Sequence, residues 1–297
     1  MRKLYKLILI SLILFPSIAF SREMLQIDPL FEYPVAPEEI ESLNEKCNYL
    51  VKNFWNDFNF KTESPLDQYA LNDAFQVYSS TFRFADKKDV EQSVDKLLEK
   101  LSKNPLLLQQ FMKAAEENLY GPRADFWSDD VYIKFLEAVL KNKKISENRK
   151  SKYSKQYQSI KSSLTGNTAP TFSFIDMNGE EKNYFPMSTP TILIFGNPDD
   201  TDWRLSRLKL ESNFSLSDNL TKGKINILYI IPFNEDNWKE MISNYNKYWT
   251  LGTSSEVSAK YDLRLNPSIY VVGSDGKIIL KTNSTEEASD ASLNLIN

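Results

Sequence analysis

The chain has 297 residues, a formal net charge of −4 at pH 7, one cysteine and no histidine. Without histidine, Ser-His-Asp and Cys-His catalysis and His-ligated zinc are excluded, and one cysteine forms neither an intrachain disulfide nor a Cys-x-x-Cys pair. Hydrophobic residues make up 41% of the chain, enough for a folded core, and an acidic charge without a basic stripe argues against a nucleic-acid partner.

Residues 1–21 have the pattern of a secretory signal peptide. Three basic residues among the first six precede an almost wholly apolar run at 7–20. This run is shorter than the ~20 residues of a membrane-spanning helix, so we expect cleavage after Ser21 rather than retention as a membrane anchor. No later segment is apolar and long enough to span a membrane, so the sequence predicts an exported chain without a transmembrane segment after cleavage.

Residues 22–37 form a proline-bearing lead-in, and residues 38–164 then predict an all-α helical bundle. Apolar residues recur at helical spacing in six segments joined by short connections. Asn104 before a proline, and Ser128 before two aspartates, are signals for a helix start. We expect helices at about 38–58, 66–78, 90–101, 105–118, 129–139 and 147–164.

The pattern changes near Gly166, and residues 165–297 predict an α/β domain with a central mixed sheet. Apolar, β-branched runs alternate with helical patterns, and Asn178-Gly179 is a strong hairpin signal. The chain as a whole is therefore expected to be an α+β two-domain protein, with the helical bundle first. We expect strands at 171–176, 191–195, 224–231, 268–272 and 277–281, one more after the hairpin turn, and helices at 200–212, 235–247, 254–261 and 285–296.

Three ordered segments of the second domain resemble the thioredoxin-like fold, in its extracytoplasmic thiol-disulfide oxidoreductase branch. They read GNTAPTF at 166–172, TILIFGNPD at 191–199 and YDLRLNPSIYVV at 261–272. The resemblance implies that the second segment leads to the active-site loop. It also implies that the third contains the cis-proline of the fold, at Asn266-Pro267.

The helical half has a resemblance of its own. The segments NYLVKNFWNDFNF at 48–60 and LYGPRAD at 119–125 are similar to a helical domain of unknown function that precedes a thioredoxin-like domain in exported Bacteroidota proteins. Together with the signal pattern, this resemblance implies the periplasm or cell envelope of a Gram-negative bacterium. It carries no function for the helical domain.

The chain departs from the oxidoreductase pattern where the chemistry would lie. The four positions that usually read Cys-x-x-Cys run here from Asp200 to Trp203, so both thiols are missing and thiol-disulfide exchange has no nucleophile there. We assign no catalytic residue, no cofactor and no metal ligand. Asp199, Asp200 and Asp202 lack the spacing of a calcium loop, and helix capping by Asp200 is favoured over a cation site.

Two features near this loop suggest a binding role. If exposed, Trp203 would anchor an apolar partner; the alternative is that it fills the core. The backbone beside the cis-proline pairs with extended peptides in the resembled fold, so Asn266 and Pro267 are candidate peptide-binding residues, or else an architectural relic. Cys47 lies on an apolar helix stripe and is expected to be buried and inert.

These features favour a redox-inactive thioredoxin-like protein that binds an unidentified protein or peptide partner. Two alternatives remain open at this stage. One is an oxidoreductase-family enzyme with divergent or one-cysteine chemistry through Cys47. The other is a structural envelope component without a specific ligand, which would have Trp203 buried.

Overall fold

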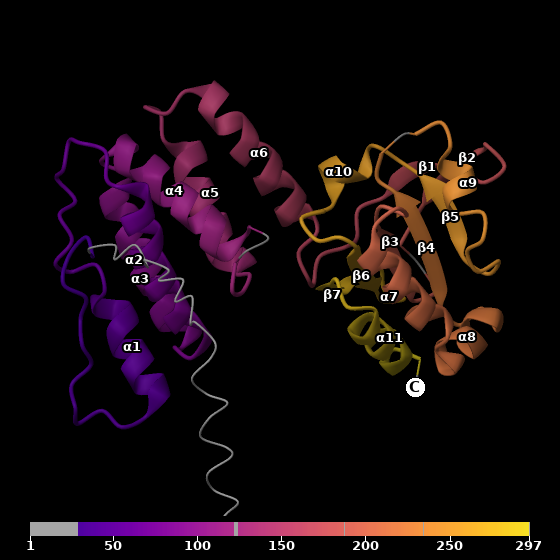
Figure 1. The fold of residues 1–297 in the computed structure, drawn as a ribbon, viewed down its shortest axis with the longest axis horizontal. Coiled ribbons are helices and arrows are strands. Elements are labelled where there is room, and N and C mark those ends of the chain that lie inside the picture. Colours follow the sequence, from indigo (N-terminus) through magenta and orange to yellow (C-terminus); the bar gives the residue numbers. More distant parts are fainter. Residues whose placement is uncertain (1–28, 122–123, 187, 234, 297) are drawn as a thin grey trace, which may run out of the picture.

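The computed structural model describes residues 29–121, 124–186, 188–233 and 235–296. Figure 1 shows two parts side by side, a helical part and an α/β part, connected through the last helix of the first. The signal peptide expected at residues 1–21 lies outside the described residues. Among the helices that the structure describes, none is long and apolar enough to cross a membrane.

The helical part contains the six expected helices. Helix α2 packs on α4, α4 on α5, and α5 on α6. The first helix starts later than expected because Ser42 caps it, accepting the backbone N–H of Glu45; it ends at Asn53, although Phe54 and Phe58 beyond its end are still buried. The helices are α1 (Leu43–Asn53), α2 (Gln68–Ser80), α3 (Lys87–Leu101), α4 (Pro105–Leu119), α5 (Asp129–Lys141) and α6 (Glu147–Ser162), with a 3₁₀ turn at Thr81–Arg83.

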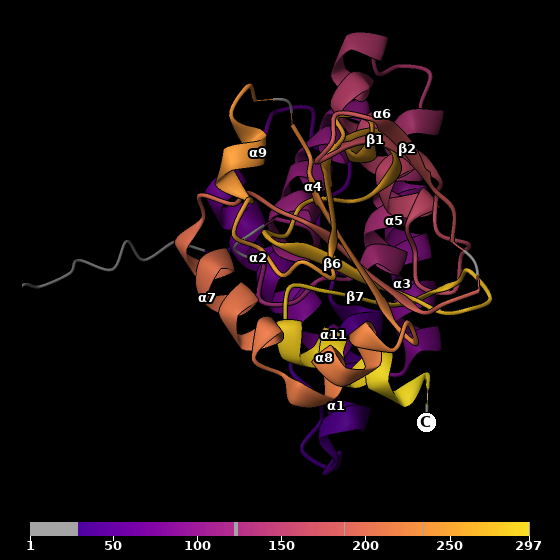
Figure 2. The ribbon, with the colours of Figure 1, turned by 90° about the vertical axis from the view of Figure 1, so that its right-hand side faces the viewer.

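The α/β part is built on one seven-stranded mixed sheet in the order β2-β1-β5-β4-β3-β6-β7. Strands β3, β4 and β5 run parallel, and the other neighbouring pairs are antiparallel. Figure 2 views this part with the helical part behind it. The strands are β1 (Phe172–Asp176), β2 (Glu181–Tyr184), β3 (Thr191–Phe195), β4 (Asn226–Ile231), β5 (Thr250–Thr253), β6 (Ser268–Val272) and β7 (Ile278–Thr282).

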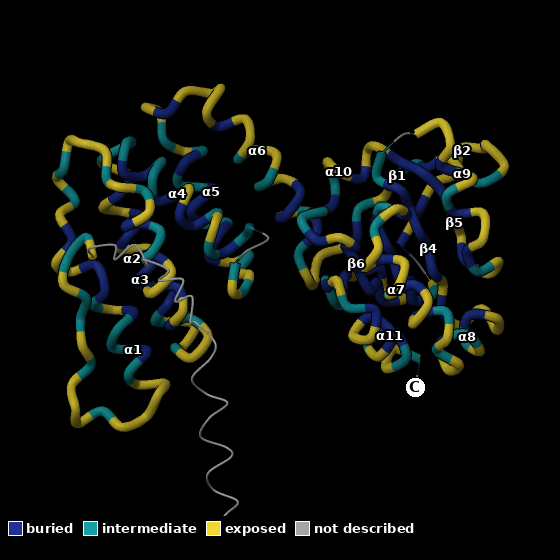
Figure 3. Tube along the Cα trace, in the orientation of Figure 1, coloured by how far each residue is buried: buried dark blue, intermediate teal, exposed yellow. Residues whose placement is uncertain are grey.

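Helices cover both faces of this sheet. The side chains of β3 alternate between two cores: Ile192 and Ile194 face α7 and α11, whereas Leu193 and Phe195 face the side of α10. Figure 3 shows the buried central strands within the more exposed helices. The helices are α7 (Thr201–Glu211), α8 (Phe214–Thr221), α9 (Trp238–Met241), α10 (Val257–Lys260) and α11 (Thr285–Asn294).

The sequence prediction was wrong in two regions of the sheet domain, one on each side of β4. The helix expected at 235–247 is only the four-residue α9, and the strand β5 and the helix α8 were missed. Trp238, Ile242 and Tyr245 are buried, as the helical pattern predicted. The backbone after α9, however, forms turns instead of continuing as a helix. Strand β5 is short, and Gly252 within it lies so close to β1 that a Cβ atom would lie 2.5 Å from the Phe174 ring.

Candidate functional site

The loop before α7, residues 196–200, begins where the central strand β3 ends. Its last residue, Asp200, is the N-cap of α7: the Asp200 carboxylate accepts the backbone N–H of Trp203 at 2.8 Å. Its first residue, Gly196, packs against Pro267, since an added Cβ would lie 3.5 Å from the Pro267 Cβ. The capping role that the sequence predicted for Asp200 is therefore confirmed.

The neighbouring carboxylates do not point toward a common position where a metal ion could bind. Asp199 pairs with Arg204 at 3.2 Å, and Arg204 also donates to the carbonyl of Pro198. Asp202 is exposed in the first turn of α7. Within the described ranges, no group of three acidic or cysteine side chains is placed to hold a metal ion.

Trp203 is a core residue. It has no exposed surface, its indole stacks on Tyr229 at 5.1 Å with 7° between the ring planes, and its Nε1 donates to the Tyr245 hydroxyl at 2.9 Å. The suggestion of an exposed Trp203 that anchors a partner is therefore wrong, and the core-filling alternative is right. The indole is held from β4 and from the segment after α9, neither of which is near it in sequence.

The aromatic cluster around Trp203 is uncharged. Burial raises the pKa of both the Tyr229 and the Tyr245 hydroxyls. The Tyr229 hydroxyl donates to the Gly196 carbonyl at 2.9 Å, and the Arg207 guanidinium lies 4.2 Å from the centre of the Tyr245 ring. Stacking, a satisfied indole N–H and two satisfied hydroxyls thus occupy the space under the start of α7.

The expected cis peptide bond is present at Asn266-Pro267. Pro267 is buried, whereas Asn266 is exposed and accepts the Asn197 backbone N–H through its side-chain oxygen at 3.4 Å. Within the described part of the chain, the backbone N–H and C=O of Asn266 make no hydrogen bond. We name residues 264–267 the cis-proline loop; in the described part of the chain, its exposed residue Asn266 has one backbone donor and one backbone acceptor without a partner.

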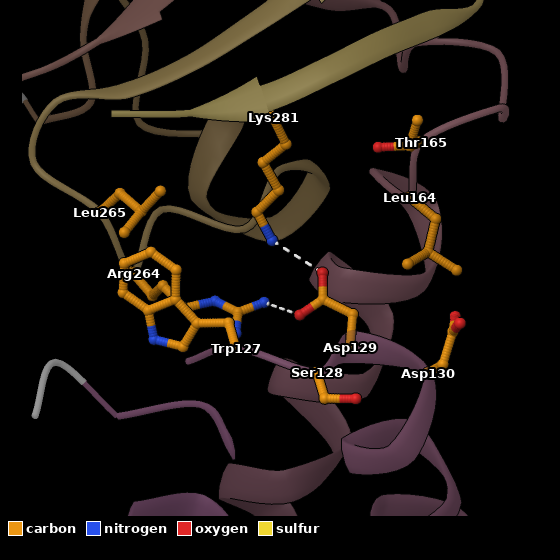
Figure 4. A pocket seen from close by; sticks show the side chains of 9 residues that line it. All are labelled: Trp127, Ser128, Asp129, Asp130, Leu164, Thr165, Arg264, Leu265 and Lys281. Carbon is orange, nitrogen blue, oxygen red and sulfur yellow. Dashed lines mark hydrogen bonds and ion pairs between the residues drawn. The ribbon is translucent and has the colours of Figure 1, made fainter. Parts of the chain in front are cut away.

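Four charged side chains join the two parts at the other end of this loop. Asp129 comes from α5 of the helical part and Lys281 lies on β7; Figure 4 shows both of them with Arg264. Asp262 precedes the cis-proline, as Arg264 does. Arg264 pairs with both aspartates, and so does Lys281, whose ammonium lies 3.1 Å from Asp129. We call these four residues the interdomain network; each aspartate contacts two cations, so their formal charges balance.

The interdomain network is deeply buried around Asp262, whose side chain is 1% exposed. Burial by itself raises the pKa of the Asp262 carboxyl, but the charges of Lys281 and Arg264 outweigh it, so the pKa is lowered. Tyr120 of the helical part covers the group: its ring lies 4.2 Å from the Arg264 guanidinium, and its hydroxyl donates to Asp262 at 3.4 Å.

A cleft of about 580 Å³ opens beside the interdomain network. Both parts of the molecule line this cleft (Figure 4). The sheet side contributes Arg264, Leu265 and Lys281, and the helical side with its connection to the sheet contributes Trp127, Ser128, Leu164 and Thr165. Leu265 lies next to Asn266, so the cleft reaches the cis-proline loop. Sequence reasoning missed this cleft and the interdomain network, because their residues come from segments that no local pattern connects.

Cys47 lies in the other part of the molecule, on α1. It is buried and free, and burial raises the pKa of its thiol. The expectation of a buried cysteine is confirmed. A thiol in this state is a poor nucleophile, because the thiolate is the reactive form.

Comparisons with known proteins agree with the two-part reading. Residues 17–163 match the family model of a domain of unknown function, DUF5106. A crystal structure of a thioredoxin-like protein from Bacteroides caccae is 19% identical, with a TM-score of 0.74 over 90% of this chain and 99% of that one. The thioredoxin domain of a thiol-disulfide oxidoreductase from Bacteroides vulgatus is 20% identical, with a TM-score of 0.39 over 45% of this chain and 99% of that one. Among curated proteins, no relative matches.

The N-terminal part of this chain is thus similar to the DUF5106 family model, and its C-terminal part has a thioredoxin-like fold in a chain whose single cysteine, Cys47, lies outside that fold.

Proposed function

We propose that this protein is a redox-inactive thioredoxin-like protein of the cell envelope that binds an extended segment of a protein or peptide partner at the cis-proline loop. The observation that carries the proposal is Asn266, which is exposed and whose backbone N–H and C=O have no partner among the described residues, beside a buried cis-proline. An extended peptide satisfies such a pair by adding itself as a strand, and this needs no thiol.

The cleft beside the loop supports the same reading. A peptide paired with Asn266 would continue past Leu265 toward Trp127, whose side chain is 41% exposed. Tryptophan at such a position supplies a large apolar contact with one polar edge. In this proposal the helical part contributes one wall of the binding site, and the boundary between the two domains lies between residues 164 and 165.

The decisive test uses the backbone of Asn266. Peptides are selected from a random library displayed on phage against the chain from residue 22 onward, and their affinity is measured by calorimetry. Asn266→Pro removes the backbone N–H and is expected to weaken binding about tenfold, because one directed hydrogen bond is lost. Asn266→Ala keeps the backbone and is the matched control, with affinity close to that of the unaltered chain. Equal affinities for the two variants would refute the proposed site.

An enzyme that uses Cys47 is the first alternative, and a labelling experiment separates it from the proposal. We expect the folded chain to leave Cys47 unmodified by a thiol reagent at neutral pH, and the unfolded chain to react at once. Burial of the thiol and its raised pKa are the reasons. Rapid labelling of the folded chain, together with thiol-dependent turnover that Cys47→Ser abolishes, would favour the enzyme.

A structural envelope component is the second alternative, and the buried Trp203 is what this alternative predicted. The binding proposal therefore rests on Asn266 and not on Trp203. This alternative predicts that peptides selected on the protein do not share one binding site at the cis-proline loop, so that they do not compete with one another for it. Export is tested separately, by N-terminal sequencing of the protein isolated from the envelope fraction. We expect its first residue to be Arg22.

A further inference from the structure

A second cavity lies within the helical part, away from the thioredoxin-like fold. It has a volume of about 240 Å³ and lies between the end of α1, the turn after it and the last half of α3. Its apolar lining is formed by Trp55, Phe60 and Leu97. An apolar cavity of about 150 Å³ holds a benzene ring, so this volume accommodates a ring together with a small polar group.

The polar side chains around this cavity are mostly cationic. Lys52, Lys96, Lys100 and Lys103 line it, against Glu99 as the only acid of its lining. Because Lys52 pairs with Asp89 and Lys103 with Glu99, their charges are offset locally. Within the described ranges, Lys96 and Lys100 form no ion pair, in a chain whose overall charge is negative.

The spacing of these two lysines places their positive charges close together on one face of α3. Lys96 and Lys100 stand at i and i+4 on α3, where like charges repel each other. The Lys100 ammonium lies 4.7 Å from the centre of the Phe60 ring, so one cation already sits over the aromatic side of the cavity. Cations near Leu101, where α3 ends, are favoured by the negative end of the helix dipole. The dipole does not explain why these cations surround an apolar cavity.

Trp55 provides an independent observation. Its side chain is 5% exposed and packs among aromatic rings, and its indole N–H has no acceptor within the described residues. An indole N–H only donates, and a buried donor without an acceptor is costly. By contrast, the hydroxyl of Ser93, which lines the same cavity, donates to the carbonyl of Val51 and bonds the Tyr78 hydroxyl.

We propose that this cavity binds a small organic anion with an apolar ring, such as an aromatic carboxylate. In the bound state the ring packs on Trp55, Phe60 and Leu97, and the ammonium groups of Lys96 and Lys100 pair with the carboxylate. The indole N–H of Trp55 then gains an acceptor. The site is independent of the cis-proline loop and of the function proposed for it.

The test is a calorimetric titration of the chain from residue 22 onward with 1-naphthoate. Naphthalene-1-methanol is the uncharged analogue and acetate is the anion without a ring. We expect saturable binding of naphthoate that weakens with added salt, and at least about tenfold weaker binding of each of the other two. The double variant Lys96→Gln with Lys100→Gln is expected to weaken naphthoate binding about tenfold or more, because the charge-assisted hydrogen bonds are lost.

Lys113→Gln is the matched control, since Lys113 is an exposed lysine of the same helical part outside the cavity. It should leave naphthoate affinity unchanged. Trp55→Phe keeps the ring and removes the N–H, and is expected to lower the affinity severalfold; circular dichroism checks that it folds. The proposal is overturned if naphthoate does not bind at millimolar concentration, or if the double variant loses no more affinity than Lys113→Gln.

Discussion

The two ends of the cis-proline loop differ in what the fold has buried beside them. At the α7 end, the uncharged rings of Trp203, Tyr229 and Tyr245 fill the space with close ring contacts and satisfied hydrogen bonds. At the other end, Asp262 and Arg264 belong to a buried group of four charges that reaches across to the helical part. The space under the start of α7 is a packed aromatic core, whereas charged side chains are buried at the boundary between the two parts.

A large loss of stability is expected from a single substitution at the charged end. Asp262→Asn leaves Arg264 and Lys281 with only Asp129 for two buried cations. Breaking one partner of a buried ion pair costs about 3–5 kcal/mol of the free energy of unfolding, measured by denaturant titration. The control is Asp130→Asn, because Asp130 pairs with Lys87 at an exposed position and the expected loss is about 0–1 kcal/mol. Similar losses in the two variants would contradict a buried network.

The same carboxyl gives the charged end a pH dependence. The pKa of Asp262 is lowered in the folded chain, so the unfolded chain takes up its proton at a higher pH than the folded chain does. The stabilisation is therefore complete above the ordinary aspartate pKa of about 4 and is lost as the pH falls through the lowered value. Measured at pH 7 and again below pH 4, the stability gap between the unaltered chain and Asp262→Asn should narrow.

At the aromatic end, Trp203→Ala removes the largest fully buried side chain of the cluster. The cavity left behind is expected to cost about 3–5 kcal/mol, again from denaturant titration. Trp203→Phe keeps most of the volume and loses the hydrogen bond to Tyr245, so a smaller loss is expected. If Trp203→Ala were neutral, the indole would not be part of the core and the comparison between the two ends would fail.

Local sequence patterns predicted the elements that depend on local rules. Strands β3 and β6 were placed with the observed bounds because continuous β-branched runs are typical of strands buried on both faces. The cap at Asp200 followed from an aspartate before a helical pattern. In contrast, the buried position of Trp203 depends on Tyr245, which lies 42 positions away in the sequence.

The interdomain network could not be predicted from spacing. Asp129 lies 135 positions from Arg264 and 152 from Lys281, and each of these residues alone has an ordinary local explanation. Asp129 is an acid in the first turn of α5, which favours the helix dipole whether or not a partner is present. Only the packing of the two parts brings the four charges together.

A smaller effect is expected for the link between the parts. Asp129→Asn keeps the volume but removes one of two carboxylates, and Arg264 and Lys281 still have Asp262. We expect a loss of about 1–3 kcal/mol, as for hydrogen bonds to charged groups. The loosened interface should also increase the radius of gyration in small-angle X-ray scattering. An unchanged scattering curve and unchanged stability would show that Asp129 does not hold the two parts together.

The smallest effect separates the two uses of aspartate at the start of α7. Asp200→Ala removes the N-cap of α7, whose carboxylate accepts the Trp203 backbone N–H, and is expected to cost about 1 kcal/mol. Asp199→Ala removes only an exposed pair with Arg204, and little change is expected. Both effects are read from thermal unfolding by circular dichroism. Asp199 and Asp200 both carry a negative charge next to the start of α7. Equal losses in the two variants would mean that this charge, acting on the helix dipole, stabilises the helix rather than the cap geometry. A loss confined to Asp200→Ala assigns the stabilisation to the one hydrogen bond of the cap.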